Sequence, residues 1–498
     1  MSRRSDDPGA AYVERLATLG VLPTGVSDDS RQVRPGDLFL AYPGDLADGR
    51  DHISEAIAKG AVAVFWEASS ADAKQFTWQS NWAITNLPVP GLRKLRGPLA
   101  HAIHGRPSER LPLLAVTGTN GKTSVTQWIA QSHPRRCAVI GTLGAGLLGE
   151  TFETGFTTPE ATTLTRLLAD FSKSGVQLCA LEASSIGIAE GRLDGARIDT
   201  AIFTNLTRDH LDYHGTMEAY AEAKIKLFTW PRLRLAICNL DDPLGPLIAA
   251  RTTASKFLGY SQTESASWRS AIVRAEMIVE TIDGLRFRLC TPAGRTMVET
   301  RLLGRYNISN LLAVAAVLVD AGLTPKDIAA RFAALRSPAG RLERVGGVNE
   351  PLVVVDYAHT PDALQNALQT LRPTATARGA GLTVIFGCGG DRDRGKRALM
   401  GEIAGRLADR VVLSSDNPRH EDPLSILDEI RSGVLSAEVI VDRSVAIRQT
   451  ILTAHPAEVI LIAGKGHEPY QEIAGVRKPF SDLSEARAAL AVRREMAT

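Results

Sequence analysis

The segment from Gly118 to Thr123, which reads GTNGKT, carries the residue types that bind phosphate. It follows an apolar run that ends in LLAV and precedes a helical pattern, so a strand, a loop and a helix are expected in that order. Small residues let backbone N–H groups face phosphate oxygens, and the start of a helix adds partial positive charge. Lys122 can reach the β- and γ-phosphates, and the Thr123 hydroxyl can bind Mg²⁺. The first glycine of the usual pattern is replaced by Val116, and the loop alone predicts a nucleotide hydrolase or transferase without saying which.

A second candidate site is the stretch Ser414–His420, SSDNPRH, in the C-terminal third of the chain. Its Asn-Pro step predicts a turn. Asp416, Asn417 and Arg419 place an acceptor, an amide and a bidentate cation within four residues. From these residues alone, a solvated loop and a loop that binds a substrate both remain open.

The elements that must position this turn alternate between strand and helix. Apolar runs typical of buried parallel strands are separated by helical patterns, which indicates an open α/β sheet. The strands are expected within residues 351–359, 382–390, 409–417, 437–444 and 458–466, and the helices within 360–371, 396–408, 422–435 and 444–455. Ligands of such sheets gather beyond the carboxyl ends of the strands, where four polar clusters fall here. These clusters are residues 356–359, 389–393, 416–419 and 464–468.

The rest of the chain predicts two further α/β units. Strands that belong with the phosphate loop are expected within residues 176–185, 199–210 and 233–242, and residues 30–67 read as strand, loop, helix and strand. The segment 336–345 contains a proline and a glycine and is a candidate hinge. We therefore expect three domains, with bounds at 1–110, 111–340 and 341–498.

Composition excludes several classes of protein. The 498 residues carry a net charge of +2 and 44% hydrophobic residues, so neither a basic nucleic-acid-binding surface nor an acidic tail is expected. The first residues contain no apolar segment typical of a secretory signal, and the longest apolar run, Leu311–Val319, is too short to cross a membrane. The five cysteines are scattered and odd in number, which predicts no disulfide framework and favours a reducing cytoplasm.

Nine motifs along the chain together resemble the Mur ligases of peptidoglycan synthesis, and most closely the MurE type, which adds the third residue of the stem peptide. In chain order they are GTNGKTS, TTPEAT, LEASS, TNLTRDHLDYHG, GRYNISN, DYAHTPDAL, GCGGDRDRGKR, SDNPRHEDP and AGKGHEPYQ. The resemblance extends from about Ser30 to Asp482. It implies an N-terminal uridine-binding α/β domain, a central P-loop ATPase-like α/β domain and a C-terminal Rossmann-like open sheet.

The resemblance also implies a reaction. ATP phosphorylates the carboxylate of UDP-N-acetylmuramoyl-dipeptide (UDP-MurNAc-dipeptide), and an amino acid then attacks the acyl phosphate to form an amide. Such a reaction depends on alignment and charge neutralisation more than on a protein nucleophile. We expect a cytoplasmic monomer that acts in cell wall biogenesis, and hence in cell shape and cell division, without nucleic acid or membrane insertion.

The metal and catalytic residues that the resemblance implies lie in the central part of the chain. Thr123 and Glu182 are candidate Mg²⁺ ligands because Mg²⁺ prefers oxygen. His210, which has Asp209, Asp212 and His214 nearby in the sequence, is implied as a ligand of a second Mg²⁺. Lys224 alone would be interpreted as a solvated helical lysine, but the resemblance implies N6-carboxylysine, a carbamate that binds Mg²⁺. Lys122, Glu182, His210 and Lys224 are the expected catalytic residues.

The remaining implied residues bind ATP and the two other substrates. Those expected at adenine, ribose and phosphate, in addition to residues 118–123 (Gly118, Thr119, Asn120, Gly121, Lys122 and Thr123), are Asn307, Asn310, Arg341, Asp356, Tyr357 and His359. Ser30 and the loop 44–49 are expected at uridine, and Thr157, Thr158, Ser184 and Arg192 at the peptide. ATP would bridge two domains, and domain closure would complete the site.

The amino-acid end is expected to use Arg392, Asp416, Asn417, Pro418, Arg419, Gly464 and Glu468. In the family, DNPR is associated with meso-diaminopimelate, whose second carboxylate Arg419 can bind with a planar fork while Glu468 pairs with the distal ammonium. Two features of the sequence leave the implied substrate contacts open to another interpretation. Thr158-Pro159 also fits the start of a helix, and Ile186 stands where many relatives have histidine.

Other functions stay open at this point. The chain could be an L-lysine-adding relative, another Mur ligase or a folylpolyglutamate-synthase-like ligase. From a different class, it could be a nucleotide-switched binding protein, which would hydrolyse ATP whether or not the other substrates were present.

Overall fold

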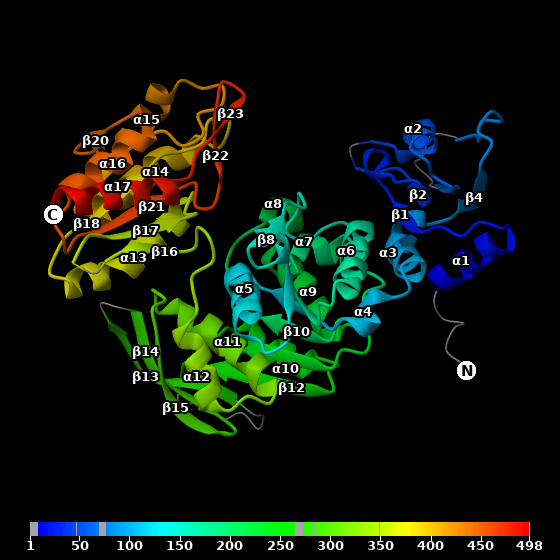
Figure 1. Cartoon of the computed structure of the whole chain (residues 1–498), viewed down its shortest axis with the longest axis horizontal. Helices are drawn as coiled ribbons and strands as arrows, with labels where there is room; N and C mark the ends of the chain where they lie inside the picture. Colours follow the sequence, from blue (N-terminus) through cyan, green and yellow to red (C-terminus); the bar gives the residue numbers. More distant parts are fainter. Residues whose placement is uncertain are drawn as a thin grey trace. The chain divides into compact units, whose positions relative to one another are not determined.

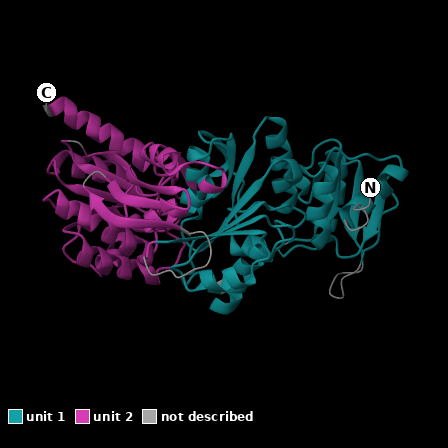
Figure 2. Cartoon of the chain, turned by 90° about the horizontal axis from the view of Figure 1, so that it is seen from below, with its two compact units in different colours: residues 1–261, 265–272, 313–318 teal, residues 262–264, 273–312, 319–498 magenta. Residues whose placement is uncertain are grey.

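The computed structural model describes residues 8–45, 47–68, 76–263, 272–281, 284–347 and 349–497, without the side chains of Asp212, Ile272 and Ala497. The chain divides into two compact units, shown in different colours in Figure 2. The first unit comprises residues 1–261, 265–272 and 313–318, and the second comprises residues 262–264, 273–312 and 319–498. Each unit is described by itself.

The first unit begins with a four-stranded parallel sheet in the order β1-β2-β3-β4. Its strands are β1 (Gly25–Ser27), β2 (Asp37–Ala41), β3 (Ala63–Glu67) and β4 (Thr85–Val89), and its helices are α1 (Pro8–Thr18), α2 (Ile53–Ala58) and α3 (Leu92–Ile103). The order of β2, α2 and β3 confirms the strand, loop, helix and strand predicted for residues 30–67.

A second sheet of the first unit carries the phosphate loop, with strand order β12-β11-β10-β5-β9-β6-β7-β8. Its parallel strands are β5 (Leu113–Thr117), β6 (Cys137–Gly141), β9 (Leu178–Glu182), β10 (Thr200–Phe203), β11 (Leu235–Asn239) and β12 (Lys256–Ser261). The antiparallel strands β7 (Gly144–Leu147) and β8 (Glu150–Phe152) extend one edge. The three strands predicted after the phosphate loop are thus confirmed as β9, β10 and β11.

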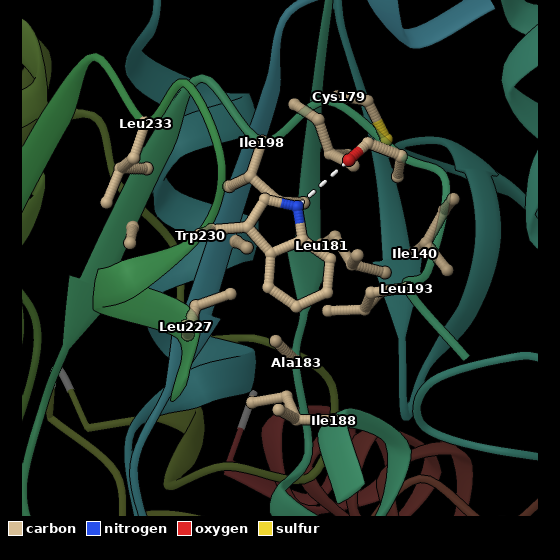
Figure 3. Close-up of a cluster of buried hydrophobic side chains, with 14 of the residues drawn as sticks. Ile140, Cys179, Leu181, Ala183, Ile188, Leu193, Ile198, Leu227, Trp230 and Leu233 are labelled. Atoms are coloured by element: carbon tan, nitrogen blue, oxygen red, sulfur yellow. Dashed lines mark hydrogen bonds between the residues drawn. The ribbon is translucent and has the colours of Figure 1, made fainter. Parts of the chain in front are cut away.

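One face of this sheet packs on a buried apolar cluster, part of which Figure 3 shows around Trp230. The indole Nε1 of Trp230 donates a hydrogen bond to the carbonyl oxygen of Ala196 at 2.9 Å, so the polar atom of this large ring is satisfied inside the core. Leu181 of β9 belongs to the same cluster and lies next to Glu182, which faces the site. Tight packing below the strand therefore fixes the position of a functional side chain at its end.

The second unit contains a six-stranded sheet in the order β16-β17-β21-β18-β19-β20. Its strands are β16 (Glu343–Gly346), β17 (Leu352–Asp356), β18 (Leu382–Phe386), β19 (Arg410–Leu413), β20 (Glu438–Val439) and β21 (Val459–Ala463), and only β16 runs antiparallel to its neighbour. The helices are α13 (Pro361–Ala377), α14 (Gly395–Leu407), α15 (Pro423–Arg431), α16 (Arg443–Thr453) and α17 (Asp482–Ala497). The strands and helices predicted for residues 351–466 are confirmed.

The helices of this sheet lie on its two faces, and each group packs on its own apolar core (Figure 1). Helices α13, α14 and α15 contribute to one core, and α16 and α17 contribute to the other. The sheet is therefore covered on both sides, as a parallel sheet requires. The unit also holds the strands β13 (Ile272–Thr281), β14 (Gly284–Thr291) and β15 (Gly294–Thr300), the helix α12 (Pro325–Ala333) and the hairpin of β22 (Tyr470–Ile473) and β23 (Val476–Pro479).

Two predicted absences can be checked in the part of the chain that the structure describes. All five cysteines are buried and free. The residues of the run Leu311–Val319 lie within α11 (Tyr306–Asp320), and among the described residues no helix has the length and apolarity needed to span a bilayer.

Candidate active site

The phosphate loop joins β5 to α5 (Lys122–Ser132), as the sequence predicted. Gly118 has a φ of 147° and Gly121 a φ of 87°, backbone conformations that favour glycine. A Cβ at position 118 would overlap the hydroxyl of Thr204, so only glycine permits this approach. The Lys122 ammonium lies over the loop and donates to the carbonyl oxygens of Gly118 and Thr119 at 2.9 and 2.8 Å.

Two residues that follow β10 hold the loop from the side. The backbone N–H of Asn120 donates to Oδ1 of Asn205 at 2.9 Å, and the Thr204 hydroxyl donates to the carbonyl oxygen of Asn120 at 2.6 Å. Sequence reasoning missed both as functional residues. Their position directly after a predicted strand was the signal that could have found them.

Glu182 ends β9 and is 2% exposed. Its Oε2 accepts a hydrogen bond from the Thr123 hydroxyl at 3.0 Å, and its Oε1 accepts one from the backbone N–H of Thr142 at 3.0 Å. A buried carboxylate beside a hydroxyl is an oxygen set that Mg²⁺ accepts, so these residues fit that ion. Within the described residues no group of three or more His, Cys, Asp and Glu side chains could hold a metal.

Lys224 lies in α9 (Met217–Ile225) and is 1% exposed, so its interpretation as a solvated helical lysine is wrong. Its Nζ lies 4.1 Å from the centre of the Tyr220 ring. The hydroxyl of Tyr220 is 3.1 Å from that of Thr119 in the phosphate loop. Burial, and secondly the positive charge of Lys122, lower the pKa of the Lys224 amine to about 6. Lys224 is therefore a largely neutral amine at pH 7 beside the phosphate loop.

His210 precedes α8 (Leu211–His214) with a φ of 51° and remains exposed. Its ring lies 6.0 Å from that of Tyr220, so His210 and Lys224 both lie near the same aromatic ring. The side chain of Asp212, which the sequence placed in this group, lies outside the described residues. A ring nitrogen of His214 is 2.9 Å from the hydroxyl of Ser185.

The residues predicted at the peptide lie beside Glu182. The Thr158 hydroxyl donates to the carbonyl oxygen of Glu182 at 2.7 Å and accepts from the backbone N–H of Ser184 at 2.9 Å. Arg192 donates to the carbonyl oxygen of Thr158 at 2.8 Å. The structure thus brings Thr158, Ser184 and Arg192 together at the end of β9.

The interpretation of Thr158 as a helix cap is wrong. Helix α6 (Ala161–Lys173) has Glu160 as its N-cap residue, and the Thr158 hydroxyl is used in the contacts above. The Thr157 hydroxyl is 3.2 Å from that of Thr142, whose backbone N–H also contacts Glu182. Thr158 is therefore tied to the backbone of Glu182, and Thr157 is linked to the Glu182 carboxylate through Thr142.

The uridine prediction concerns the first sheet. Ser30 is buried and its hydroxyl donates to Oε2 of Glu55 at 2.7 Å. Leu46, in the predicted loop 44–49, lies outside the described residues. The uridine site stays a prediction.

The predicted adenine and ribose residues all belong to the second unit. Asn307 and Asn310 are buried, and the Nδ2 of Asn310 donates to Oδ1 of Asn307 at 3.0 Å. The guanidinium carbon of Arg341 lies 5.5 Å from the centre of the Tyr357 ring, and the ring of His359 lies 4.5 Å from it. Arg341, Tyr357 and His359 therefore form one aromatic and cationic group.

Asp356 lies at the carboxyl end of β17. Its Oδ2 accepts a hydrogen bond from the backbone N–H of Leu342 at 2.8 Å. Burial outweighs this bond and raises the pKa of Asp356 to about 6. Partial desolvation also lowers the pKa of His359.

The turn 414–420 follows β19, and its backbone is held by the hairpin β22–β23. Arg419 has a φ of 50°, its backbone N–H donates to the carbonyl oxygen of Glu472 at 3.1 Å, and its own carbonyl accepts from Ala474 at 2.6 Å. Oδ1 of Asn417 accepts from the backbone N–H of Glu472 at 2.9 Å. Sequence reasoning did not predict that this hairpin grips the turn.

The side chains of the same region form a polar cluster. Asn417 donates to Oε2 of Glu468 at 2.8 Å, and the fully buried Lys465 contacts Asn417 at 3.0 Å and Glu468 at 3.1 Å. A Cβ at Gly464 would overlap Oδ2 of Asp416, so the two chain segments touch there. Lys465 was missed by the sequence interpretation, although it lies between two predicted residues.

Arg392 and Arg419 flank Gly389: a Cβ there would lie 3.7 Å from Cγ of Arg392 and 2.9 Å from Nη1 of Arg419. Arg419 donates from Nη1 to the carbonyl oxygen of Gly390 at 2.7 Å. Across the described ranges this is the one hydrogen bond of its guanidinium group, and no carboxylate pairs with it. A half-buried guanidinium with this free capacity can bind a carboxylate with a planar fork.

Family models match three parts of the chain. They are the Mur ligase family catalytic domain at residues 23–103, the Mur ligase middle domain at 116–318 and the Mur ligase glutamate ligase domain at 340–466.

Curated relatives and solved structures match over nearly the full length. Two relatives carry the name UDP-N-acetylmuramoyl-L-alanyl-D-glutamate–2,6-diaminopimelate ligase. One, from Chromobacterium violaceum, is 45% identical over 95% of this chain and 96% of its own. The other, from Pseudomonas aeruginosa, is 47% identical over 93% of this chain and 94% of its own. A solved structure with the same name is 37% identical, with a TM-score of 0.69 and coverage of 95% of each chain.

Proposed function

The chain belongs to the Mur ligase family, and we propose that it is the member that joins meso-diaminopimelate to UDP-N-acetylmuramoyl-L-alanyl-D-glutamate in peptidoglycan synthesis, at the expense of ATP. The reaction forms an amide between a carboxylate of the dipeptide and an amino group of the incoming amino acid. ATP supplies the driving force through an acyl phosphate, and ADP and phosphate are released.

The proposal that meso-diaminopimelate, and not lysine, is the amino-acid substrate rests on the position of Arg419. Its guanidinium group is half-buried at the carboxyl ends of the strands, with Arg392 beside it and no carboxylate paired to it in the described chain. Diaminopimelate differs from lysine by a second carboxylate, which is the group that a planar, bidentate cation binds best. Lysine would leave this guanidinium unpaired.

Glu468 has less capacity to bind the substrate than an unpaired carboxylate would have. Its Oε2 is held by Lys465 and Asn417, so we assign it to the amino group of the substrate only through its remaining oxygen. Asp416 and Asn417 line the same turn and would orient the α-amino and α-carboxylate groups.

The phosphate end uses Lys122, Thr123 and Glu182. We propose that Lys122 leaves the loop carbonyls to neutralise the transferred phosphate, and that Thr123 and Glu182 would hold Mg²⁺, which would offset the charge of the phosphates. Thr158 and Arg192 lie beside Glu182 and would bring the dipeptide carboxylate to this charge. The Mg²⁺ ions would stabilise the charge that develops during phosphoryl transfer.

Lys224 fits a carbamate for two reasons. Its amine is neutral above about pH 6 and can therefore attack CO₂, with loss of one proton to form a carboxylate on nitrogen. The resulting carboxylate would lie next to the phosphate loop, where the positive charge of Lys122 would offset its own charge. His210, whose ring lies 6.0 Å from that of Tyr220, would bind a second Mg²⁺ together with this carbamate.

The experiment that tests the function measures phosphate release with each substrate omitted in turn. Release is expected only when ATP, UDP-MurNAc-dipeptide and meso-diaminopimelate are all present, and the tripeptide product should appear by mass spectrometry. Faster turnover with L-lysine than with meso-diaminopimelate would contradict the proposal. ATP hydrolysis in the absence of both other substrates would point to the switch protein considered above.

A further inference from the structure

A buried ion-pair network lies directly beneath the turn that carries Arg419. Its centre is Arg397 of α14, which is 0% exposed. Its two terminal nitrogens donate to the two oxygens of Glu421 at 2.8 and 3.0 Å, and Nη1 also donates to Glu429 at 2.9 Å. Glu421 lies two residues after Arg419, and Glu429 lies in α15.

The network reaches the backbone of the loop 389–393 on the other side. Oε1 of Glu421 accepts a hydrogen bond from the backbone N–H of Asp391 at 2.6 Å, and Arg397 donates to the carbonyl oxygen of Gly389 at 3.4 Å. Arg397 and Glu421 together therefore fix the residues on either side of Gly390. Gly390 is the residue whose carbonyl oxygen binds the guanidinium of Arg419.

The loop 389–393 and the turn 414–421 pack too closely to shift independently of each other. A Cβ at Gly390 would overlap the carbonyl oxygen of Pro418, and the backbone N–H of Gly390 donates to the carbonyl oxygen of Asn417 at 2.9 Å. Any displacement of the loop 389–393 would therefore move the acceptor that orients Arg419.

The cost of burying Arg397 indicates that this network contributes more to the position of the loop 389–393 than to the free energy of unfolding. Burying a guanidinium costs desolvation energy that ion pairs offset only in part, so apolar residues of similar volume often stabilise a core as well. Nε of Arg397 is buried without a hydrogen-bond partner among the described residues, which adds to that cost. The ion pair with Arg397 lowers the pKa of Glu421 to about 2, so the network stays charged throughout the pH range of enzyme assays.

We propose that Arg397 and Glu421 are positioning residues that set the direction of the Arg419 guanidinium, and thereby the affinity for the second carboxylate of the amino-acid substrate. They do so through Gly390 and Asp391, without contact to the substrate. This inference rests on the proposed diaminopimelate-adding function.

The test compares Arg397→Lys with a matched control. Lysine keeps the charge but cannot hold Glu421, Glu429 and Gly389 at once, because it lacks the planar fork. Arg378 supplies the control: it ties backbone carbonyls together just before β17 and β21, at the opposite ends of the strands, and Arg378→Lys removes a comparable number of hydrogen bonds there. Michaelis constants for meso-diaminopimelate, ATP and UDP-MurNAc-dipeptide are measured for both, with thermal unfolding by circular dichroism.

Arg397→Lys is expected to raise the KM for diaminopimelate by about threefold to thirtyfold, since the loss of the Arg419 guanidinium itself sets the upper limit, with the KM for ATP changed less than about twofold. Arg378→Lys should lower Tm without a selective change in any KM. If Arg397→Lys does not fold, Glu421→Gln gives the same test, because it keeps the shape of the side chain and removes its charge. Equal effects of the two arginine variants on all three KM values would overturn the inference.

A double mutant separates positioning from a direct or a general effect. Since Arg397 is proposed to act through Arg419, Arg397→Lys should add little to the KM for diaminopimelate in an Arg419→Ala background. Full additivity would overturn the inference and leave the proposed function intact. A wild-type protein that does not use diaminopimelate would instead overturn the proposed function, and this inference with it, before any variant is compared.

Discussion

The phosphate loop and the turn around Arg419 position their side chains by different means. In the phosphate loop, six consecutive residues adopt their shape through two glycines and the start of α5. The turn around Arg419 depends on three segments far apart in the chain: the loop 389–393, the turn 414–421 and the hairpin 470–479. Backbone torsion within the loop is the main determinant of the first site, with Thr204 and Asn205 holding it from the side, whereas contacts between distant segments fix the second.

This difference suggests how each site responds to change. A site fixed by backbone torsions tolerates changes at a distance but not within the loop. A site fixed by side-chain contacts between segments should lose precision when any one of those contacts is altered, even where the substrate is not touched. The following predictions test that contrast.

The largest effect is expected at Lys224. Lys224→Ala removes the amine that we propose carries a carbamate, and turnover should fall by about a thousandfold or more, in line with the loss of a group that stabilises transition-state charge. Lys226→Ala is the matched control, because Lys226 lies two residues away and is exposed. Steady-state kinetics with added bicarbonate should show no rescue of Lys224→Ala. Near-normal turnover of that variant would refute the role of Lys224.

A pair of glycine variants addresses the contrast directly. Gly118→Ala would clash with Thr204, and Gly390→Ala would clash with Pro418. We expect Gly118→Ala to raise the KM for ATP and Gly390→Ala to raise the KM for diaminopimelate, each by roughly a hundredfold. Substrate-saturation curves for both substrates check this. Equal loss for both substrates in either variant would mean that the two sites are not positioned separately.

Arg419→Ala should have a smaller but selective effect. Loss of the guanidinium leaves the second carboxylate of diaminopimelate without its partner, which costs about 2 kcal/mol and corresponds to about a thirtyfold rise in KM. The KM for ATP should hardly change. Competition between diaminopimelate and L-lysine gives a second measurement, because the preference for diaminopimelate should shrink in this variant.

The last prediction concerns Asp356 and the pH dependence of stability, with little effect on substrate affinity expected. The pKa of this carboxyl is raised from 3.8 to about 6 on folding, so between these values the native state binds more protons than the unfolded state. Ionised Asp356 therefore destabilises the fold, and this cost grows as pH rises through that window. Asp356→Asn should raise the free energy of unfolding by about 1 to 3 kcal/mol at pH 7 and by much less at pH 4. Denaturant titrations at both pH values provide the measurement, and an equal change at both would contradict it.

The strands of both parallel sheets could be predicted from the sequence because each is a short apolar run followed by polar residues. This rule holds for β17, β18, β19 and β21, and for β5, which leads into the phosphate loop. Local patterns of this kind carry most of the fold, since burial on both faces requires continuous apolar strands.

The contacts between segments could not be predicted in the same way. Nothing near Arg397 in the sequence indicates that Glu421 and Glu429 are its partners, because the pairing depends on how α14 and α15 pack. The burial of Lys224 was hidden for a similar reason. Its neighbours in α9 are mixed, and the burial results from packing against Tyr220 and the phosphate loop. Helix propensity and periodicity describe a single element and not its neighbours.

The buried Trp230 has a practical consequence for experiments on this chain. All six tryptophans occur by residue 268, so residues 273–498 contain none. Fluorescence excited at the red edge of the indole band therefore reports on the first unit alone, where Trp230 and Trp128 are shielded from water. Circular dichroism reports on both units together. Paired melts by the two signals would show whether a variant such as Arg397→Lys loosens only the unit that contains it, an optical separation that requires no added label.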